Sequence, residues 1–486
     1  MNYSVIRRTT GLVMKFEAIF LLLPALTGMI YREREGLIYL GLAAAYYLIG
    51  YLINFKVETR ASFYTKEGFI SVGLVWIVIS LCGALPFVLC GDIPSYPDAL
   101  FETISGFTTT GSSILSDVEA LSHAGLFWRS FTHWVGGMGV IVFVLAIMPM
   151  RKGGTGNQIH MMRAESPGPV VGKLVPKTNE TAKILYALYI ALTVLQTSLL
   201  MFGGMDLYDA VCHAMATAGT GGFSTMNASI GAFSSPYIEW VCTVFMILFG
   251  VNFNAYFFLF LGKDKKDAFR LTEVRWYFLI IAFSVVTITI NIHKMFDNLF
   301  LAFHHAAFQV GSVITTTGYA TADFDLWPQY SRCLLVLIMF IGACAGSTGG
   351  GIKVSRIIIL VKAGLQEIHH YIHPRAVTSV HMDGKPVENE TVRSVIMYLG
   401  IYIVIFCSSV LLVTAFDGGE SLETVFTAVT ATINNIGPGL SAVGPTANFG
   451  HLSLASKFVL MFDMLAGRLE LYPMLLLIYH LFGRRK

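Results

Sequence analysis

The sequence predicts an all-α polytopic membrane protein in which four parallel helix–pore-loop–helix repeats surround a pseudo-fourfold pore, beside an N-terminal two-helix hairpin. Three observations predict this fold: an apolar composition, a series of long apolar segments, and an internal repeat. Hydrophobic residues make up 55% of the 486-residue chain and charged residues only 13%, whereas a soluble domain carries about 25% charged residues. The bilayer is therefore the expected solvent.

Apolar segments that are long enough to span a bilayer recur along the whole chain. A spanning helix needs about 20 mostly apolar residues. Ten segments satisfy this requirement: 11–30, 37–54, 70–90, 125–149, 183–202, 236–261, 276–292, 329–361, 394–416 and 454–482. The first is too long, and too basic at its flank, for a cleaved signal peptide.

Lys and Arg collect at alternate ends of these segments. They are concentrated near the N-terminus and in the stretches 56–66, 151–183, 263–275, 353–393 and 484–486. By the positive-inside rule both chain termini face the cytoplasm, and an even number of spans agrees with that. Because topology accounts for the basic stretches, no nucleic-acid partner is expected.

An internal repeat is the most informative feature of the chain. Four times, a span is followed by a short amphipathic segment that ends in a Gly-containing turn, and a second span follows. These short segments are 98–113, 209–224, 302–319 and 423–439. About a dozen helical residues cover only roughly 18 Å, so these segments cannot cross a bilayer. Irregular backbone at membrane depth is tolerated only where it is buried in protein or lines a water-filled path. The repeats therefore predict a pore.

The repeats divide the chain into five units. The expected boundaries are 1–66 for the accessory hairpin, 67–182 for repeat 1, 183–272 for repeat 2, 273–390 for repeat 3 with a gate loop, and 391–486 for repeat 4. The first two spans, within 11–54, carry no pore segment and are therefore placed outside the fourfold core.

The turns that end the four short segments carry the chemistry expected of a cation filter. Two of them read Thr-Thr-Thr-Gly, and the others read AGTG and NNIG. Potassium needs closely spaced, uncharged oxygen ligands when it loses its hydration shell, and backbone carbonyls supply them. Glycine permits the backbone angles that turn carbonyls toward one axis. Aligned on Gly111, Gly221, Gly318 and Gly437, the predicted potassium-binding residues are Thr109, Thr110, Gly111, Thr220, Gly221, Thr316, Thr317, Gly318, Asn435, Ile436 and Gly437.

The four turns differ in sequence, so the predicted ring is asymmetric. We expect it to discriminate less strongly between potassium and sodium than a ring of four identical turns. The alternative interpretation is that these glycines only allow close helix packing, as small residues do in membranes.

A second feature is the run GACAGSTGGGIK at 342–353, inside the span 329–361. Glycines and small residues in the middle of a span should break the helix, and a broken helix below a filter is a candidate gate. The predicted gate residues are Gly346, Ser347, Thr348, Gly349, Gly350, Gly351 and Lys353, together with Arg468. The alternative is a tight helix crossing.

Arg468 lies near the middle of the last apolar span, where a charge is costly and indicates function by default. A guanidinium below a cation filter repels the ion and has hydrogen bonds to donate to carbonyls of the glycine run. The alternative is a purely structural ion pair with Asp463 or Glu470, which are near in sequence.

Taken together, these motifs resemble the Trk/Ktr/HKT superfamily of potassium transporters, and within it the bacterial Trk-type membrane subunit. The resemblance covers essentially the whole chain. It rests on SGFTTTGSS (105–113), HWVGGMGV (133–140), ATAGTGGFST (216–225), TTTGY (315–319), GACAGSTGGGIK (342–353) and AGRLELYP (466–473). The extra hairpin at 11–54 is similar to the Trk branch.

The resemblance implies several properties that spacing does not reveal. Gly111, Gly221, Gly318 and Gly437 would be the filter glycines, and the 343–351 loop would be an intramembrane gate opposed by Arg468. The protein would be a homodimer in a bacterial cytoplasmic (inner) membrane, with one pore per subunit. Cytoplasmic regulatory subunits with RCK domains would bind nucleotide, so this chain itself is expected to bind no cofactor and to carry potassium as its substrate.

Two other classes of membrane protein fit the sequence less well. A secondary transporter would have inverted repeats and broken helices, but the Lys and Arg pattern makes all four repeats parallel; whether sodium or protons move with potassium stays open. A membrane enzyme using His304 and His305 would need convergent catalytic groups, and none is apparent, so no enzymatic activity is predicted. His369 and His373 have a zinc-binding spacing but no obvious third ligand, and a solvated face is expected.

Overall fold

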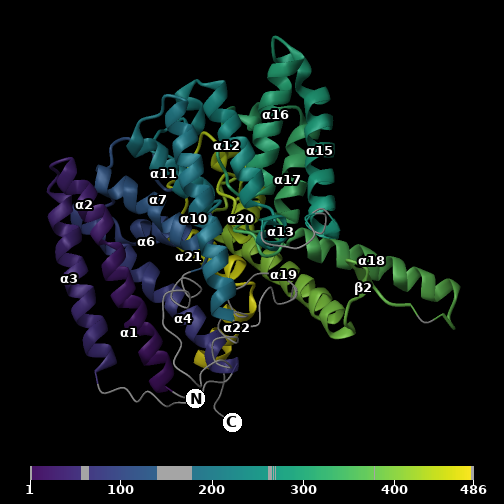
Figure 1. Cartoon of the computed structure of the whole chain (residues 1–486), viewed down its shortest axis with the longest axis horizontal. Helices are drawn as coiled ribbons and strands as arrows, with labels where there is room; N and C mark the ends of the chain where they lie inside the picture. The colour runs from purple at the N-terminus through teal and green to yellow at the C-terminus, as the bar shows by residue number, and fades with distance from the viewer. Residues whose placement is uncertain are drawn as a thin grey trace.

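The computed structural model describes residues 3–55, 65–139, 178–260, 265, 268, 270–376 and 378–482 (Figure 1). These residues are mostly helical, which confirms the predicted all-α class. Within them the strands are β1 (His381–Met382) and β2 (Lys385–Pro386), which form a small antiparallel pair after the long helix α18 (Val354–Ile372).

The N-terminal hairpin consists of α1 (Tyr3–Phe20), α2 (Leu22–Ile30) and α3 (Glu35–Asn54). These helices lie at one edge of the molecule (purple in Figure 1). Gly28 and Gly36 bring α2 and α3 close together, because a methyl group on Gly28 would lie 2.7 Å from the Cα atom of Gly36. Small residues at such crossings let two membrane helices approach closely.

Each of the four repeats contains a long first helix, a short pore helix and a second helix. The first helices are α4 (Thr65–Gly83), continued by α5 (Leu85–Cys90), then α10 (Thr178–Phe202), α15 (Thr272–Ile292) and α19 (Asn389–Phe416). The pore helices are α6 (Tyr96–Phe107), α11 (Leu207–Ala218), α16 (Leu299–Ile314) and α20 (Leu422–Asn434). The second helices are α7 (His123–Gly137), α12 (Pro236–Phe249), α17 (Gln329–Ile341) and α21 (Leu454–Arg468).

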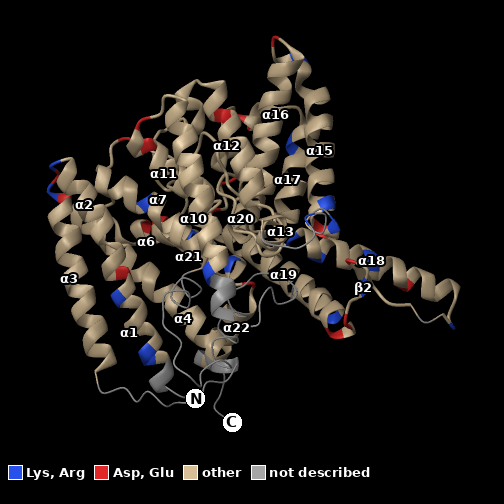
Figure 2. Cartoon of the chain, in the orientation of Figure 1, with Lys and Arg blue, Asp and Glu red and all other residues tan. Residues whose placement is uncertain are grey.

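The first helices have the length and composition of membrane spans. By these criteria six segments qualify among the described residues: Ile6–Ile30, Glu35–Asn54, Gly68–Cys90, Lys183–Phe202, Thr272–Met295 and Asn389–Phe416. Along α3 and α15 charged residues occur only near one end (Figure 2). Only 22% of the apolar window of α19 is buried within the protein, so most of its apolar surface faces outward, as expected of a helix in a membrane protein.

The second helices are short, and three of them are followed by a break. α12 is followed by α13 (Phe253–Phe260) at an angle of 93°. α17 ends before the glycine run, and α18 then runs off to one side of the molecule (Figure 1). α21 ends at Arg468, and α22 (Tyr472–Phe482) starts after Glu470 and Leu471, which both have positive φ.

The predicted second spans therefore need correction. The break within the span 329–361 agrees with the prediction from the glycine run. The spans predicted at 236–261 and 454–482 are not single helices, because the backbone turns at 250–252 and at 469–471. α7 covers the first part of the span predicted at 125–149, and residues 140–149 lie outside the described residues.

Candidate functional site

The four pore helices end in turns with the same backbone geometry. One or two residues after each pore helix ends, a residue has a left-handed conformation, with φ between 53° and 61°; these residues are Thr109, Thr220, Thr316 and Asn435. Positive φ in a β-branched residue such as threonine is a rare conformation. It costs about 1–3 kcal/mol and persists where the surroundings enforce it, often at functional sites.

A repeated hydrogen bond fixes the register of the four turns. Each turn donates a backbone N–H to a carbonyl five residues earlier: Thr110 to Ser105 (2.8 Å), Gly221 to Ala216 (2.9 Å), Thr317 to Ser312 (2.8 Å) and Ile436 to Ala431 (3.0 Å). The next residue is in every case a glycine with φ between 80° and 100°: Gly111, Gly222, Gly318 and Gly437.

This register corrects one element of the sequence alignment. In repeat 2 the residue equivalent to Gly111 is Gly222, and Gly221 is equivalent to Thr110. The sequence AGTGG contains consecutive glycines, so the sequence alone does not distinguish the two positions.

The four glycines form a closed ring with four backbone carbonyls. A methyl group on each glycine would lie against the carbonyl oxygen that precedes the glycine of the next repeat: Gly111 at 1.9 Å from Gly221 O, Gly222 at 2.0 Å from Thr317 O, Gly318 at 2.1 Å from Ile436 O, and Gly437 at 3.0 Å from Thr110 O. Because real Cβ atoms essentially never approach other atoms within 3.0 Å, the first three contacts exclude any side chain. The ring closes in the order of the repeats, which is the arrangement expected of four parallel units around one axis.

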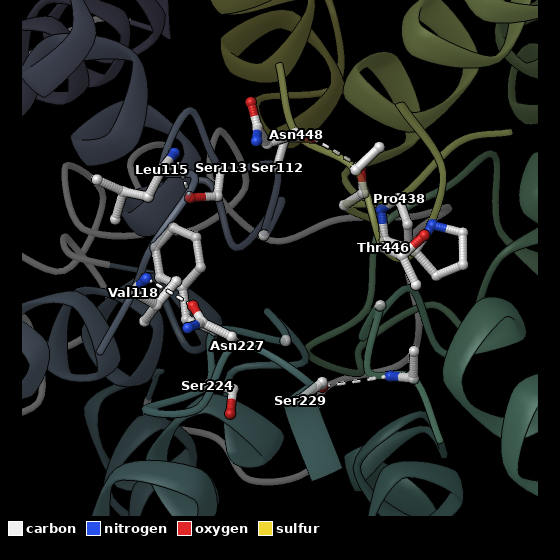
Figure 3. Close-up of a pocket in the computed structure, with 18 of the residues that line it drawn as sticks. Ser112, Ser113, Leu115, Val118, Ser224, Asn227, Ser229, Pro438, Thr446 and Asn448 are labelled. Carbon is white, nitrogen blue, oxygen red and sulfur yellow. Dashed lines mark hydrogen bonds between the residues drawn. The ribbon is translucent and has the colours of Figure 1, made fainter. Parts of the chain in front are cut away.

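A cavity of about 210 Å³ opens onto this ring (Figure 3). All four of these glycines line it, together with Ser112, Ser224 and Asn448 and other small or polar residues. Segments from all four repeats surround the open centre in Figure 3. Among the residues that line this cavity, one is charged, Arg129. Its side chain is 2% exposed and forms an ion pair with Glu102 at 2.7 Å.

The fourth turn differs from the others in its side-chain contacts. Thr108 and Thr110 share a hydroxyl–hydroxyl bond of 2.8 Å, as do Thr315 and Thr317. In repeat 4 the amide of Asn435 instead donates to the Thr110 hydroxyl, at 2.9 Å, and to the Met464 carbonyl, also at 2.9 Å. The ring is therefore asymmetric, as the sequence predicts.

The glycine run lies directly against two of these turns. The Gly350 N–H donates to the Thr316 hydroxyl at 2.6 Å, and the Gly351 N–H donates to the Asn434 carbonyl at 3.1 Å. A methyl group on Gly350 would lie 2.3 Å from the Asn434 carbonyl oxygen. The loop between α17 and α18 is thus attached to the turns of repeats 3 and 4.

Glu273, at the start of α15, holds this loop and the first turn of α18. One of its carboxylate oxygens accepts from the N–H of Ala345 at 2.6 Å and from the N–H of Ser355 at 3.1 Å. Lys353, a predicted gate residue, is 2% exposed and donates through Nζ to the Gly349 carbonyl. Glu273 is not among the residues predicted from the sequence, because Ala345 and Ser355 are 72 and 82 residues away in the chain.

Arg468 connects the loop to repeat 1. Its Nη1 donates to the Thr348 carbonyl at 2.8 Å, and its Nη2 donates to the carbonyls of Gly136 and Gly137 at 2.5 and 2.8 Å. These three bonds join the end of α21, the glycine run and the end of α7.

The two carboxylates considered as structural partners of Arg468 have other contacts. Glu470 pairs with Arg356 at 2.6 Å. Asp463 accepts a bond of 2.8 Å from Ser409. The contacts between Arg468 and the three carbonyls therefore favour the interpretation that Arg468 acts on the loop.

This fold and this ring define the class of protein: a polytopic membrane protein whose four repeats meet at one central axis. A family model described as "Cation transport protein", TrkH, matches residues 42–482. The chain therefore belongs to the TrkH family of cation transport proteins.

Individual relatives agree over the full length of the chain. The Trk system potassium uptake protein TrkH of Escherichia coli (strain K12) is 37% identical, and TrkG of the same organism is 34% identical; both alignments cover 100% of this chain and of the relative. The crystal structure of the potassium transporter TrkH from Vibrio parahaemolyticus superposes with a TM-score of 0.88 at 33% identity, again over 100% of both chains.

Proposed function

We propose that this protein takes up potassium through the ring of four turns, as a membrane subunit of a Trk system. The observation that carries the proposal is the closed ring in which each glycine packs against a carbonyl of the next repeat. Backbone carbonyls held around one axis can replace the hydration shell of a cation. The names of the relatives, which are potassium uptake proteins, favour potassium as the ion.

The proposed filter consists of the residues of the four turns, including the four ring glycines. They are Thr109, Thr110, Gly111, Thr220, Gly221, Gly222, Thr316, Thr317, Gly318, Asn435, Ile436 and Gly437. The pore helices direct their C-terminal, partly negative ends at this ring, which favours a cation.

The gate in this proposal is the loop 342–353. Its contacts with Thr316 and Asn434 place it against the filter turns. Arg468 and Lys353 add two cationic side chains to the loop, and both donate to its carbonyls. In the closed state these bonds tether the loop and the positive charges oppose a cation; breaking them releases the loop and opens the path.

The proposed location is a bacterial inner membrane with both termini in the cytoplasm. The basic stretches at alternate ends of the spans support this orientation. The proposed assembly is a homodimer that binds cytoplasmic, nucleotide-binding RCK subunits. We further propose that the chain transports ions without catalysing a reaction.

Rubidium-tracer uptake into liposomes tests the proposed function. Purified protein is reconstituted into vesicles loaded in parallel with potassium, sodium or choline salts. Uptake with potassium well above that with sodium supports a potassium-preferring pore, and equal uptake contradicts the potassium preference. A further arm with an imposed sodium or proton gradient measures whether either ion is coupled to uptake.

An inactive preparation is interpreted with the Arg468→Ala variant. If the isolated subunit is held shut, this variant should conduct; if the variant is also inactive in correctly folded protein, the pore assignment is wrong.

A further inference from the structure

A cluster of metal-ligating side chains lies outside the pore. Glu239 belongs to the first turn of α12, whereas His304 and His305 belong to α16. One ligand atom from each of the three residues lies within 4.8 Å of the other two. Among the described residues, no second group of three or more His, Cys, Asp or Glu side chains converges in this way.

The cluster is largely removed from solvent. Glu239 is 8% exposed and His304 is 4% exposed, and Nε2 of His304 is hydrogen-bonded to Oε2 of Glu239. The rings of Trp240 and Phe296 pack beside the two imidazoles, with centroids 5.1 Å from His304 and 4.9 Å from His305. An apolar surround of this kind strengthens interactions between charges and limits the access of water.

We propose that Glu239, His304 and His305 form a site for a divalent transition-metal ion of the zinc type. Two imidazoles and one carboxylate are a common protein ligand set for zinc, with water in the fourth position. This ligand set disfavours Mg²⁺ and Ca²⁺, which prefer oxygen ligands.

The hydroxyl of Thr321 supports this assignment. It lies 3.2 Å from Nδ1 of His305. A metal-binding histidine is usually held in orientation by a hydrogen bond to its other ring nitrogen, and Thr321 provides such a partner.

A metal ion at this position would clamp repeat 2 to repeat 3. Thr321 follows the turn glycine Gly318 by three residues, and the neighbouring Ala320 already binds repeat 2 through the N–H of Gly231 and the hydroxyl of Ser229. The metal would add a link between α12 of repeat 2 and the pore helix α16 of repeat 3. In Figure 1, α12 and α16 lie toward the end of the molecule away from both chain termini. The inference concerns metal binding only and does not depend on the proposed potassium transport.

Two features of the chain allow a controlled binding experiment. His369 and His373, at the C-terminal end of α18, are exposed and have rings 4.9 Å apart, so they are a source of background metal binding. The experiment therefore uses the full-length protein carrying His369→Ala and His373→Ala, without an affinity tag. His123 pairs with Glu33 at 2.7 Å, but the described residues supply no third ligand there, so His123→Ala is the matched control.

Zinc binding is measured by equilibrium dialysis, and thermal unfolding is measured with and without Zn²⁺ or Mg²⁺. We expect one zinc ion per chain and stabilisation by Zn²⁺ but not by Mg²⁺, because a ligand that binds the folded state raises its stability. His305→Asn leaves the bond between Glu239 and His304 in place and should weaken zinc binding by more than about tenfold, since even changes around metal ligands cost about 10–100-fold in affinity. His304→Ala should abolish binding, and His123→Ala should leave it unchanged.

The outcomes separate a metal site from a simple histidine–carboxylate pair. A protein that binds no zinc above the dialysis background overturns the proposal. So does zinc binding that persists unchanged in both His304→Ala and His305→Asn. If His304→Ala does not fold, the His305→Asn comparison decides the question alone, because the altered side chain is partly exposed.

Discussion

The guanidinium of Arg468 donates a hydrogen bond of 2.8 Å to the carbonyl oxygen of Thr348, across 120 residues of sequence. The same side chain donates to two carbonyls at the end of α7. A single residue of repeat 4 therefore holds the loop of repeat 3 against repeat 1. A hydrogen bond to a charged group contributes about 1.5–3 kcal/mol, and the bond to Thr348 is the one that Arg468 makes directly to the loop, so the loop loses restraint of about that size if Arg468 is removed.

Arg468→Ala is expected to raise basal rubidium uptake in the absence of any partner. A loss of about 1.4 kcal/mol of preference for the closed loop corresponds to a tenfold change in the open-to-closed ratio, and we expect at least that. Arg332→Ala is the control, because Arg332 pairs with Asp325 and Glu423 rather than with the loop. Unchanged uptake in Arg468→Ala would contradict the gate assignment.

Arg468→Lys separates tethering from charge repulsion. Lysine keeps the positive charge but lacks the planar fork that reaches several acceptors. If tethering dominates, its basal uptake should lie close to that of Arg468→Ala. Uptake close to the unmodified protein would assign the effect to charge instead.

Gly318→Ala tests the ring itself. A methyl group at Gly318 would lie 2.1 Å from the Ile436 carbonyl oxygen, and the glycine has φ of +86°. The added methyl group therefore displaces a carbonyl of the ring, and a left-handed backbone costs an L-residue about 1–2 kcal/mol in addition. We expect loss of rubidium uptake or of the preference for potassium over sodium, measured in the liposome assay.

Gly400→Ala is the matched control for that experiment. Gly400 lies in α19, and no atom lies within 4 Å of the position that a methyl group would take. The Gly400→Ala variant should therefore leave rubidium uptake and the preference for potassium over sodium unchanged. A potassium preference that survives Gly318→Ala would exclude Gly318 from the filter.

The sequence predicts the architecture because the signals for it are local. Apolar length, a short helix and a Gly-containing turn each occupy fewer than about 25 consecutive residues, and the repeat multiplies them by four. The break at 342–353 is predicted for the same reason, since the glycines between α17 and α18 lie within one short stretch of the chain.

The parts that the sequence does not predict depend on contacts between distant residues. Glu273 anchors the loop through N–H groups 72 and 82 residues away, and a lone glutamate near a basic stretch carries no sign of this role. The register of Gly222 depends on a hydrogen bond from Gly221 to Ala216. The break after Arg468 uses positive φ at Glu470 and Leu471, residue types that do not indicate a turn.

Gly350→Ala is expected to loosen the closed loop. Its methyl group would lie 2.3 Å from the Asn434 carbonyl oxygen, so the loop has to move away from the filter turns. The Gly350 bond to the Thr316 hydroxyl lengthens as a result. Basal rubidium uptake should rise, whereas Gly364→Ala in α18, where a methyl group meets no atom within 4 Å, should leave it unchanged. A tight, folded Gly350→Ala protein would indicate that the loop is packing rather than a gate.

Glu102 and Arg129 form a buried ion pair that we expect to stabilise repeat 1 and its contact with repeat 2. Their side chains are 0% and 2% exposed, and Glu102 also accepts from the Ile114 N–H at 3.0 Å. Arg129 donates in addition to the Ser224 carbonyl of repeat 2, at 3.2 Å. Removing one member of a buried pair leaves an uncompensated charge and typically costs about 3–5 kcal/mol.

Glu102→Gln should therefore lower the midpoint of thermal unfolding, measured in detergent, by much more than Glu423→Gln. Glu423 also pairs with an arginine, but its side chain is 46% exposed, and exposed pairs contribute about 0–1 kcal/mol. The double variant Glu102→Gln/Arg129→Met removes both charges, so it should recover part of the loss, because replacing a whole buried pair is often nearly neutral. Equal effects of Glu102→Gln and Glu423→Gln would mean that the buried pair contributes no more to stability than an exposed one, and that the contact between repeats 1 and 2 at Ser224 is maintained by packing alone.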